Sequence, residues 1–132
     1  MKNRNNQVNE IRSNPLGAIF ENSSFEEKFQ NQTLRPILKF QNDLLLEVFK
    51  NYFAKQKNVF YSLSPEKKMS YVENAIQRDM KFQNMLKGII IGLFTAEEYQ
   101  EYSEKSSKLN KRITNLLIER IKSQIQLLET QS

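Results

Sequence analysis

Hydrophobic side chains recur at steps of three and four residues along most of the chain, and this spacing is typical of helices. The series is longest near the C-terminus, where it comprises Leu109, Ile113, Leu116, Leu117, Ile121, Ile125 and Leu128. Side chains at this spacing share one face of an α-helix. No run alternates between hydrophobic and polar residues in the manner of a strand, and the 132 residues include only three Gly and three Pro. We therefore predict an all-α helical bundle.

Helix start signals divide this bundle into about four main helices. Ser24 and Thr95 are each followed three residues later by Glu, which matches the capping box. Ser64 precedes Pro65, and Pro is favoured in the first turn of a helix. We expect helices to start near residues 24, 34, 64 and 95, and the last one to end near Leu128.

Two positions are expected to interrupt the helical pattern. Pro36 has no backbone N–H and disfavours helical geometry at Arg35, so we expect Thr33 to cap a new helix that runs from about Leu34 to Lys57. In the following helix the hydrophobic stripe shifts to another face after residue 80. A bend or break near Asp79 would reconcile the two stripes.

The length of the chain suits one domain with a short extension. Residues 1–23 are rich in Asn and have few side chains that could dock on a core, among them Leu16, Ile19 and Phe20. We predict a flexible N-terminal arm over residues 1–23 and a single helical-bundle domain over residues 24–132.

The helix from about Leu34 to Lys57 has a hydrophobic face that is wider than an ordinary amphipathic stripe. Phe40, Leu44, Leu46 and Phe53 extend the arc on its flanks. Such a helix is either central in its domain or shared with another subunit. We therefore expect a homodimer or another protein partner.

The composition excludes several kinds of chemistry. With no His and no Cys, the chain lacks the commonest metal ligand, the usual general base near neutral pH and any thiolate. It contains no Gly-rich phosphate loop and no nucleophile elbow. The mid-helix acids that could meet as a carboxylate metal site are Asp43, Glu47, Glu73 and Asp79, but the Glu-x-x-His pairs of di-iron bundles are missing. We assign no catalytic residue, no metal site and no cofactor.

Charge and hydropathy indicate the environment of the protein. The 20 basic and 15 acidic residues give a net charge of +5 that is spread along the chain. The longest hydrophobic stretch lies at residues 89–94 and is too short to span a bilayer. We expect a soluble cytoplasmic protein without membrane contact.

Two sets of polar residues are candidate binding sites. Arg35, Asn42, Lys111 and Arg112 could converge on a small ligand between helices; alternatively, Arg35 pairs with an acidic neighbour and Asn42 lies in water. The second set is a basic cluster, which comprises Lys105, Lys108, Lys111 and Arg112.

The basic cluster could bind nucleic acid together with the arm residues Lys2, Arg4 and Arg12. Alternatively it is a solvated face, since Glu101 and Glu104 lie close enough to offset its charge. The favoured hypothesis is a non-catalytic helical protein that acts through protein–protein contacts as a homodimer. A nucleic-acid-associated regulator and a small-ligand pocket between helices are the alternatives.

Three blocks of the sequence carry a family resemblance. They are FQNQTLRPILK (29–39), KGIIIGLFTAEEY (87–99) and LNKR (109–112). They resemble a family of small bacterial all-helical proteins of unknown function, some of which carry the label glyoxalase. Metal-dependent glyoxalases hold their metal with His and Glu on a β-rich fold, whereas this chain has no His and no strand pattern. The resemblance implies a helical fold and a bacterial cytosol, and no activity.

Overall fold

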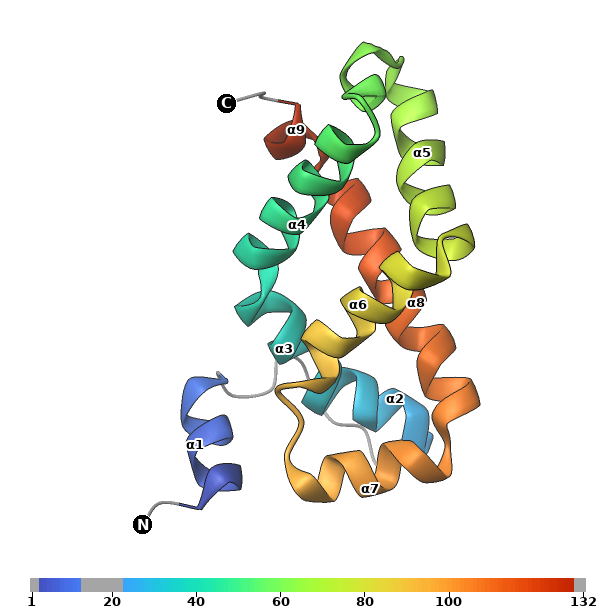
Figure 1. The fold of residues 1–132 in the computed structure, drawn as a ribbon. Coiled ribbons are helices and arrows are strands. Elements are labelled where there is room, and N and C mark those ends of the chain that lie inside the picture. Colours follow the sequence, from blue (N-terminus) through green and yellow to red (C-terminus); the bar gives the residue numbers. More distant parts are fainter. Residues whose placement is uncertain (1–2, 13–22, 130–132) are drawn as a thin grey trace. The chain divides into compact units, whose positions relative to one another are not determined.

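Helices form the regular structure of the chain. A computed structural model describes residues 3–12 and 23–129 (Figure 1), and within those ranges it contains α-, 3-10 and π-helical segments and no β-strand. The prediction of an all-α fold is confirmed at this level. The chain forms two compact units, and the boundaries between them fall after Gln41, within α6 and within α8.

Unit 1 comprises Met1–Gln41 and Lys87–Ile113. Aromatic rings form the centre of its core: Phe29 meets Phe94 edge to face at 5.4 Å, and Phe94 lies 5.7 Å from Tyr102. Its elements are α1 (Arg4–Ile11), α2 (Phe25–Phe29), η1 (Gln30–Leu34), α3 (Arg35–Phe40), the end of α6 (Met80–Ile91), α7 (Ala96–Glu104) and the first part of α8 (Ser106–Ser123).

The helix that contains Pro36 does not restart at Thr33. Residues 30–34 form a π-helical turn, in which the Arg35 N–H donates to Gln30 O, and helix continues on both sides of it. A wider turn relieves the clash between the Pro ring and the carbonyl one turn earlier, which would otherwise break an α-helix. Thr33 therefore has no capping role, and its hydroxyl is available for another contact.

The start of the chain also differs from the predicted flexible arm. Residues 4–11 form α1, with Asn3 as N-cap, and this helix buries the side chain of Val8. Arg12, at the end of α1, is buried as well. Leu16, Ile19 and Phe20 lie outside the described residues, and the boundary between an arm and a domain at residue 23 stays a prediction.

Unit 2 comprises Asn42–Leu86 and Thr114–Ser132. Its core contains stacked rings: Phe53 lies parallel to Phe60 at 3.9 Å, and Tyr52 stacks on Phe82 at 4.0 Å. Phe60 comes from η2 (Val59–Ser62) and is fully buried, whereas Val59 beside it is exposed. The elements are α4 (Asn42–Lys55), η2, α5 (Pro65–Arg78), the start of α6, the end of α8 and α9 (Ile125–Leu128).

Breaks turn the four predicted helices into a larger number of shorter ones. Asp79 has extended backbone angles (φ −88°, ψ 94°) and separates α5 from α6, as the shifted stripe predicted. Further breaks lie at Gln41, Lys105 and Gln124. The predicted starts after Ser24, Ser64 and Thr95 are confirmed, because each hydroxyl accepts a hydrogen bond from the backbone N–H three residues later.

The Asp79 side chain makes two hydrogen bonds at this break, one to α6 and one to α4. Its Oδ1 accepts from the Phe82 N–H, which caps α6, and its Oδ2 accepts from the Tyr52 hydroxyl, each at 3.1 Å. Burial, followed by this hydrogen bond and the negative charge of Asp79, raises the pKa of Tyr52 to about 12. The break is thus stabilised by one carboxylate that binds α4 and α6 within unit 2.

We expect Asp79→Ala to lower the free energy of unfolding by about 1–3 kcal/mol, because it removes a helix cap and a charge-assisted hydrogen bond. Urea unfolding followed by circular dichroism measures the change. Tyr52→Phe is the matched control, since it removes only the hydroxyl contact and should cost about 1 kcal/mol or less. Equal stability of Asp79→Ala and the wild type would contradict the role of the cap.

Candidate functional site

Two arginines from α1 bind the corner between α6 and α7, which we define as residues 92–95. Arg4 donates from Nη1 to Phe94 O at 2.7 Å and from Nη2 to Gly92 O at 2.9 Å. Arg12 donates from Nη1 to Leu93 O at 3.1 Å. Carbonyls at the C-terminal end of a helix have no partner within the helix and carry partial negative charge, so cationic donors suit them.

Helix α1 also binds a free backbone N–H at the start of α7. The Ala96 N–H, one of the free donors in the first turn of α7, donates to Asn5 Oδ1 at 2.9 Å. Residues of α1 therefore bind acceptors at the end of α6 and a donor at the start of α7. This explains why a short polar helix docks on unit 1.

Glu98 is the acceptor at the centre of this arrangement. Its Oε1 accepts from Arg12 Nη1 at 2.6 Å and from the Thr95 N–H at 2.8 Å. Its Oε2 accepts from Arg12 Nη2 at 3.0 Å and from the Thr33 hydroxyl at 2.7 Å. The side chains of Arg12 and Glu98 are 6% and 18% exposed, so the ion pair is mostly shielded from water.

The hydrogen bonds decide the charge state of Glu98. Burial by itself would raise the pKa of its carboxyl group, but donors from Arg12, Thr95 and Thr33 outweigh burial and hold the pKa below its ordinary value of 4.5. Glu98 is therefore ionised at neutral pH, and it balances the buried charge of Arg12.

Gln32 completes the surroundings of Arg12. Its carbonyl lies 3.4 Å from Arg12 Nη2, and in a regular α-helix it would accept from residue 36, which is Pro and has no N–H. Arg12 Nε is buried and has no hydrogen-bond partner among the described residues. We define the arginine socket as the acceptors that surround Arg12: Gln32 O, Leu93 O and the Glu98 carboxylate, to which the Thr33 hydroxyl also donates.

Three members of the predicted basic cluster face α2 and η1. Lys105 Nζ lies 5.5 Å from the centre of the Phe25 ring, and Lys108 Nζ lies 4.0 Å from Glu26 Oε1. Arg112 Nη1 donates to Gln30 Oε1 at 2.9 Å. These contacts give the cluster a structural role within unit 1.

The charges of the cluster act on Glu26. A backbone hydrogen bond is the largest cause that lowers the pKa of Glu26; burial opposes it, and Lys105, Lys108 and Arg112 lower the pKa further. Lys111 is exposed. An acidic residue that sequence analysis did not pair with the cluster therefore offsets part of its charge.

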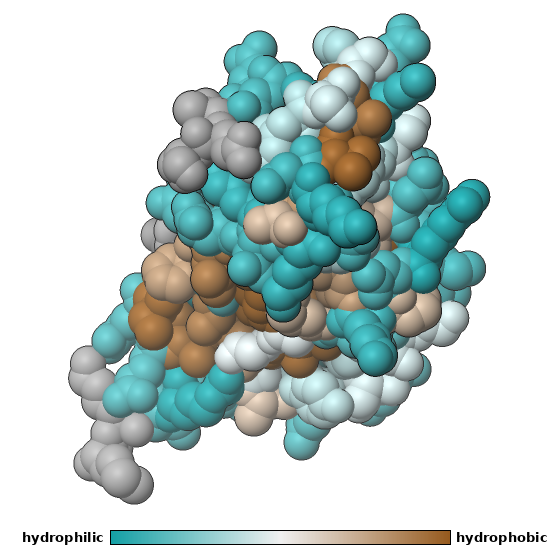
Figure 2. Space-filling view, turned by 45° about the horizontal axis from the view of Figure 1, so that its top comes forward, coloured by the Kyte–Doolittle hydropathy of each residue, from teal (hydrophilic) through white to brown (hydrophobic). Residues whose placement is uncertain are grey.

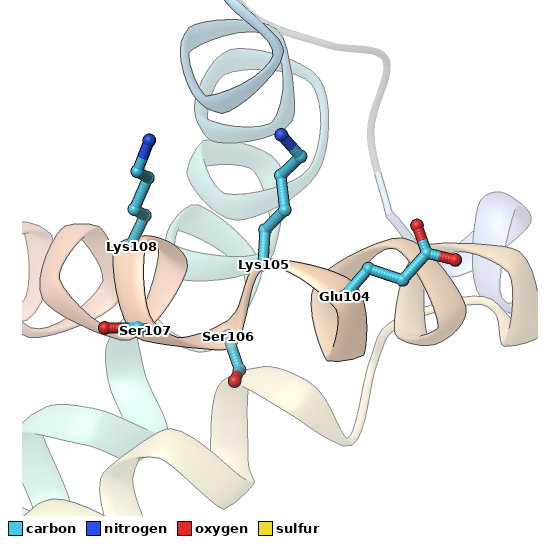
Figure 3. A pocket seen from close by; sticks show the side chains of 5 residues that line it. All are labelled: Glu104, Lys105, Ser106, Ser107 and Lys108. Carbon is cyan, nitrogen blue, oxygen red and sulfur yellow. The ribbon is translucent and has the colours of Figure 1, made fainter.

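A surface hollow of about 400 Å³ lies at the break between α7 and α8, and Glu104, Lys105, Ser106, Ser107 and Lys108 line it. In Figure 3 the ammonium groups of Lys105 and Lys108 extend to one side, whereas the hydroxyls of Ser106 and Ser107 point away from them. The polar groups of the hollow do not converge on one point. This geometry is unlike that of a catalytic or anion-binding site.

The predicted ligand-binding residues have separate local partners. Arg35 Nε donates to Asn31 Oδ1 at 3.1 Å, so its partner is an amide and not the expected acid. Asn42 belongs to unit 2, where it exchanges two hydrogen bonds with Gln124 and accepts from Arg120 Nη1 at 3.0 Å. It is not left in water as expected. Convergence of Arg35, Asn42, Lys111 and Arg112 on a ligand stays a prediction.

The acidic residues considered for a metal site are engaged elsewhere or scattered. Glu73 Oε2 accepts from Lys122 Nζ at 2.7 Å, and Asp79 binds Tyr52 and the Phe82 N–H. In the ranges 3–12 and 23–129, no three His, Cys, Asp or Glu side chains are grouped as metal ligands would be. No helix within the same ranges is long and hydrophobic enough to cross a membrane.

Sequence reasoning did not find the arginine socket. Thr95 and Glu98 were recognised as a capping box, and that local role is confirmed. The same carboxylate also binds Arg12, 86 positions away in the chain, and no local pattern marks such a partner. The spacing of Arg4 and Arg12 by two helical turns was the available signal, but it was taken as part of a basic arm.

Comparisons with known proteins return no match: no protein-family model, no curated protein sequence and no solved structure is similar to this chain.

We expect acid to release α1 from unit 1. The lowered pKa of Glu98 means that its ionisation stabilises the docked state at neutral pH, and that this contribution is lost as the pH falls below 4.5 and through the folded-state pKa. NMR chemical shifts of the α1 amides and of the Glu98 carboxyl carbon between pH 7 and pH 3 would follow both events.

Glu98→Gln should produce the same release at neutral pH, because it leaves the buried Arg12 charge uncompensated, at a cost of about 3 kcal/mol. Glu97→Gln is the matched control, since Glu97 is the exposed neighbour on the same turn. Unchanged α1 resonances in Glu98→Gln would show that the ion pair does not hold the helix.

Proposed function

We propose that the protein is a non-catalytic helical module that acts through protein–protein contacts as a homodimer. One observation carries the proposal: Leu44 on α4 and Leu127 on α9 remain 48% and 58% exposed in unit 2. Large hydrophobic side chains that gather on a surface mark interaction sites more often than single ones do. The two helices that carry them pack against each other.

An amide pair links the start of α4 to the start of α9. Asn42 and Gln124 exchange hydrogen bonds of 2.8 and 2.6 Å, and Leu44 and Leu127 follow them by two and three residues. The wide hydrophobic arc predicted for this helix is thus only partly used inside unit 2, since Phe53 is fully buried and Leu44 is not. A second copy would complete the burial.

Further hydrophobic side chains of unit 2 reach the surface. Met69, Met80 and Met85 are 42%, 54% and 48% exposed. Figure 2 shows hydrophobic surface interspersed among hydrophilic residues on one face of the molecule. Methionine adapts its shape to a partner and is common at binding surfaces. These residues support a contact function for unit 2.

We expect Leu44→Glu and Leu127→Glu each to weaken self-association at least tenfold, because a charge placed in a hydrophobic interface must be desolvated. Light scattering over a range of micromolar concentrations measures the particle mass. Val59→Glu is the matched control, since Val59 is equally exposed at 48% but lies on η2. A wild-type protein that remains monomeric at high micromolar concentration would refute the homodimer.

Nucleic-acid binding is the second candidate function, and one observation favours it. Lys105, Lys108 and Lys111 are exposed at the start of α8, and Figure 3 places the ammonium groups of Lys105 and Lys108 on the same side. Arg4 and Arg12 do not form the predicted free arm, because both bind the α6–α7 corner. Lys2 lies outside the described residues.

If the lysines bind nucleic acid, affinity should fall steeply with salt, and Lys108→Glu with Lys111→Glu should abolish binding at low salt. Filter binding with single- and double-stranded DNA and RNA at two salt concentrations tests this expectation. Lys39→Glu with Lys55→Glu, which are exposed lysines outside α8, is the charge-matched control. Equal loss in both double variants would indicate a general effect of net charge.

A further inference from the structure

Polar contacts hold α1 on unit 1 almost alone. Val8 is its one large hydrophobic side chain that is buried, and Ile11 is 49% exposed. The helix has eight residues, and isolated helices of this length are not stable in water. Residues 3–12 therefore bind the α6–α7 corner as a peptide ligand binds a site, because they fold where they dock.

The arginine socket fixes the chemistry of that ligand. Arg12 presents two nitrogens to the two oxygens of Glu98, while the carbonyls of Leu93 and Gln32 accept from the same nitrogens. A planar guanidinium matches this set of acceptors, whereas the point charge of a lysine cannot bind both carboxylate oxygens in the same way. The socket is therefore specific for an arginine side chain.

We propose that the arginine socket also accepts Arg12 of a second copy, so that residues 3–12 of one molecule dock on the α6–α7 corner of another. A second copy of the chain fits the corner because it carries the same Arg4, Asn5 and Arg12 that bind there within one molecule. Covalent geometry permits the chain between Arg12 and Ser24 to extend roughly 40 Å, which is enough to reach a neighbour. This contact uses unit 1 and goes beyond the surface proposed on unit 2.

Mass action decides which copy fills the socket. A tethered segment competes with an effective concentration in the millimolar range, so the molecule's own α1 is favoured over a free one. The exchange becomes measurable when the molecule's own ligand is weakened but the socket is left intact. Arg12→Ala and Arg12→Lys proteins provide this state, because neither changes a residue of the socket.

The first experiment uses a fluorescent synthetic peptide with the sequence of residues 1–16, added to full-length Arg12→Ala protein and followed by anisotropy. We expect it to bind at least about tenfold more tightly than the same peptide with Arg12→Lys, and more tightly than it binds wild-type protein. Full-length Arg12→Lys protein is the second host if Arg12→Ala is poorly folded. Equal affinity for both peptides, or no binding at 1 mM, overturns the proposal.

The second experiment tests exchange between whole molecules. Arg12→Glu and Glu98→Arg are each made in the Leu44→Glu background, so that the surface on unit 2 does not contribute. After joint refolding, native mass spectrometry should detect a mixed dimer that neither protein forms alone. A mixture that stays monomeric overturns the exchange, while the result for Leu44→Glu alone still decides the homodimer on unit 2.

Discussion

The carboxylate of Glu98 is the interaction on which unit 1 depends, because segments from three parts of the chain meet there. Arg12 ends α1, Thr33 lies in the π turn, and Thr95 starts α7; each donates to Glu98. A buried carboxylate is costly unless it is paired and hydrogen-bonded. The four hydrogen bonds are therefore interdependent. If any one is lost, the buried negative charge of Glu98 has fewer donors to stabilise it.

Local chemistry determines which parts of the fold could be predicted. The caps at Ser24, Ser64 and Thr95 were found, since each depends on residues within one helical turn, and the break at Asp79 was expected from the shift of the hydrophobic stripe. The breaks at Gln41 and Gln124 were not predicted, because no Gly or Pro marks them. Gln41 shows the reason: its side chain leaves the helix to donate to Ile89 O, a partner 48 positions away.

Two residues of the candidate ligand site have side-chain partners that were not predicted. Arg35 binds Asn31 in place of an acid, and Asn42 binds Gln124 in place of water. Side-chain partners of this kind depend on tertiary packing, which composition and periodicity do not encode residue by residue. The arginine socket was missed for the same reason. The capping box with Thr95 already explained why a Glu stands at position 98, so nothing in the sequence pointed to a distant partner.

Arginine and lysine have different roles in this chain, and the difference bears on function. Arg4, Arg12 and Arg112 bind carbonyl, carboxylate and amide oxygens within unit 1, as expected for a planar group with several fixed donors. Lys108 and Lys111 remain exposed on α8, and Lys105 remains exposed at the break before it. Lysines act as point charges and impose little geometry on a partner. Specific recognition must come from other groups, and the exposed leucines of unit 2 and the arginine socket of unit 1 are the surfaces with enough shape or directionality to provide it.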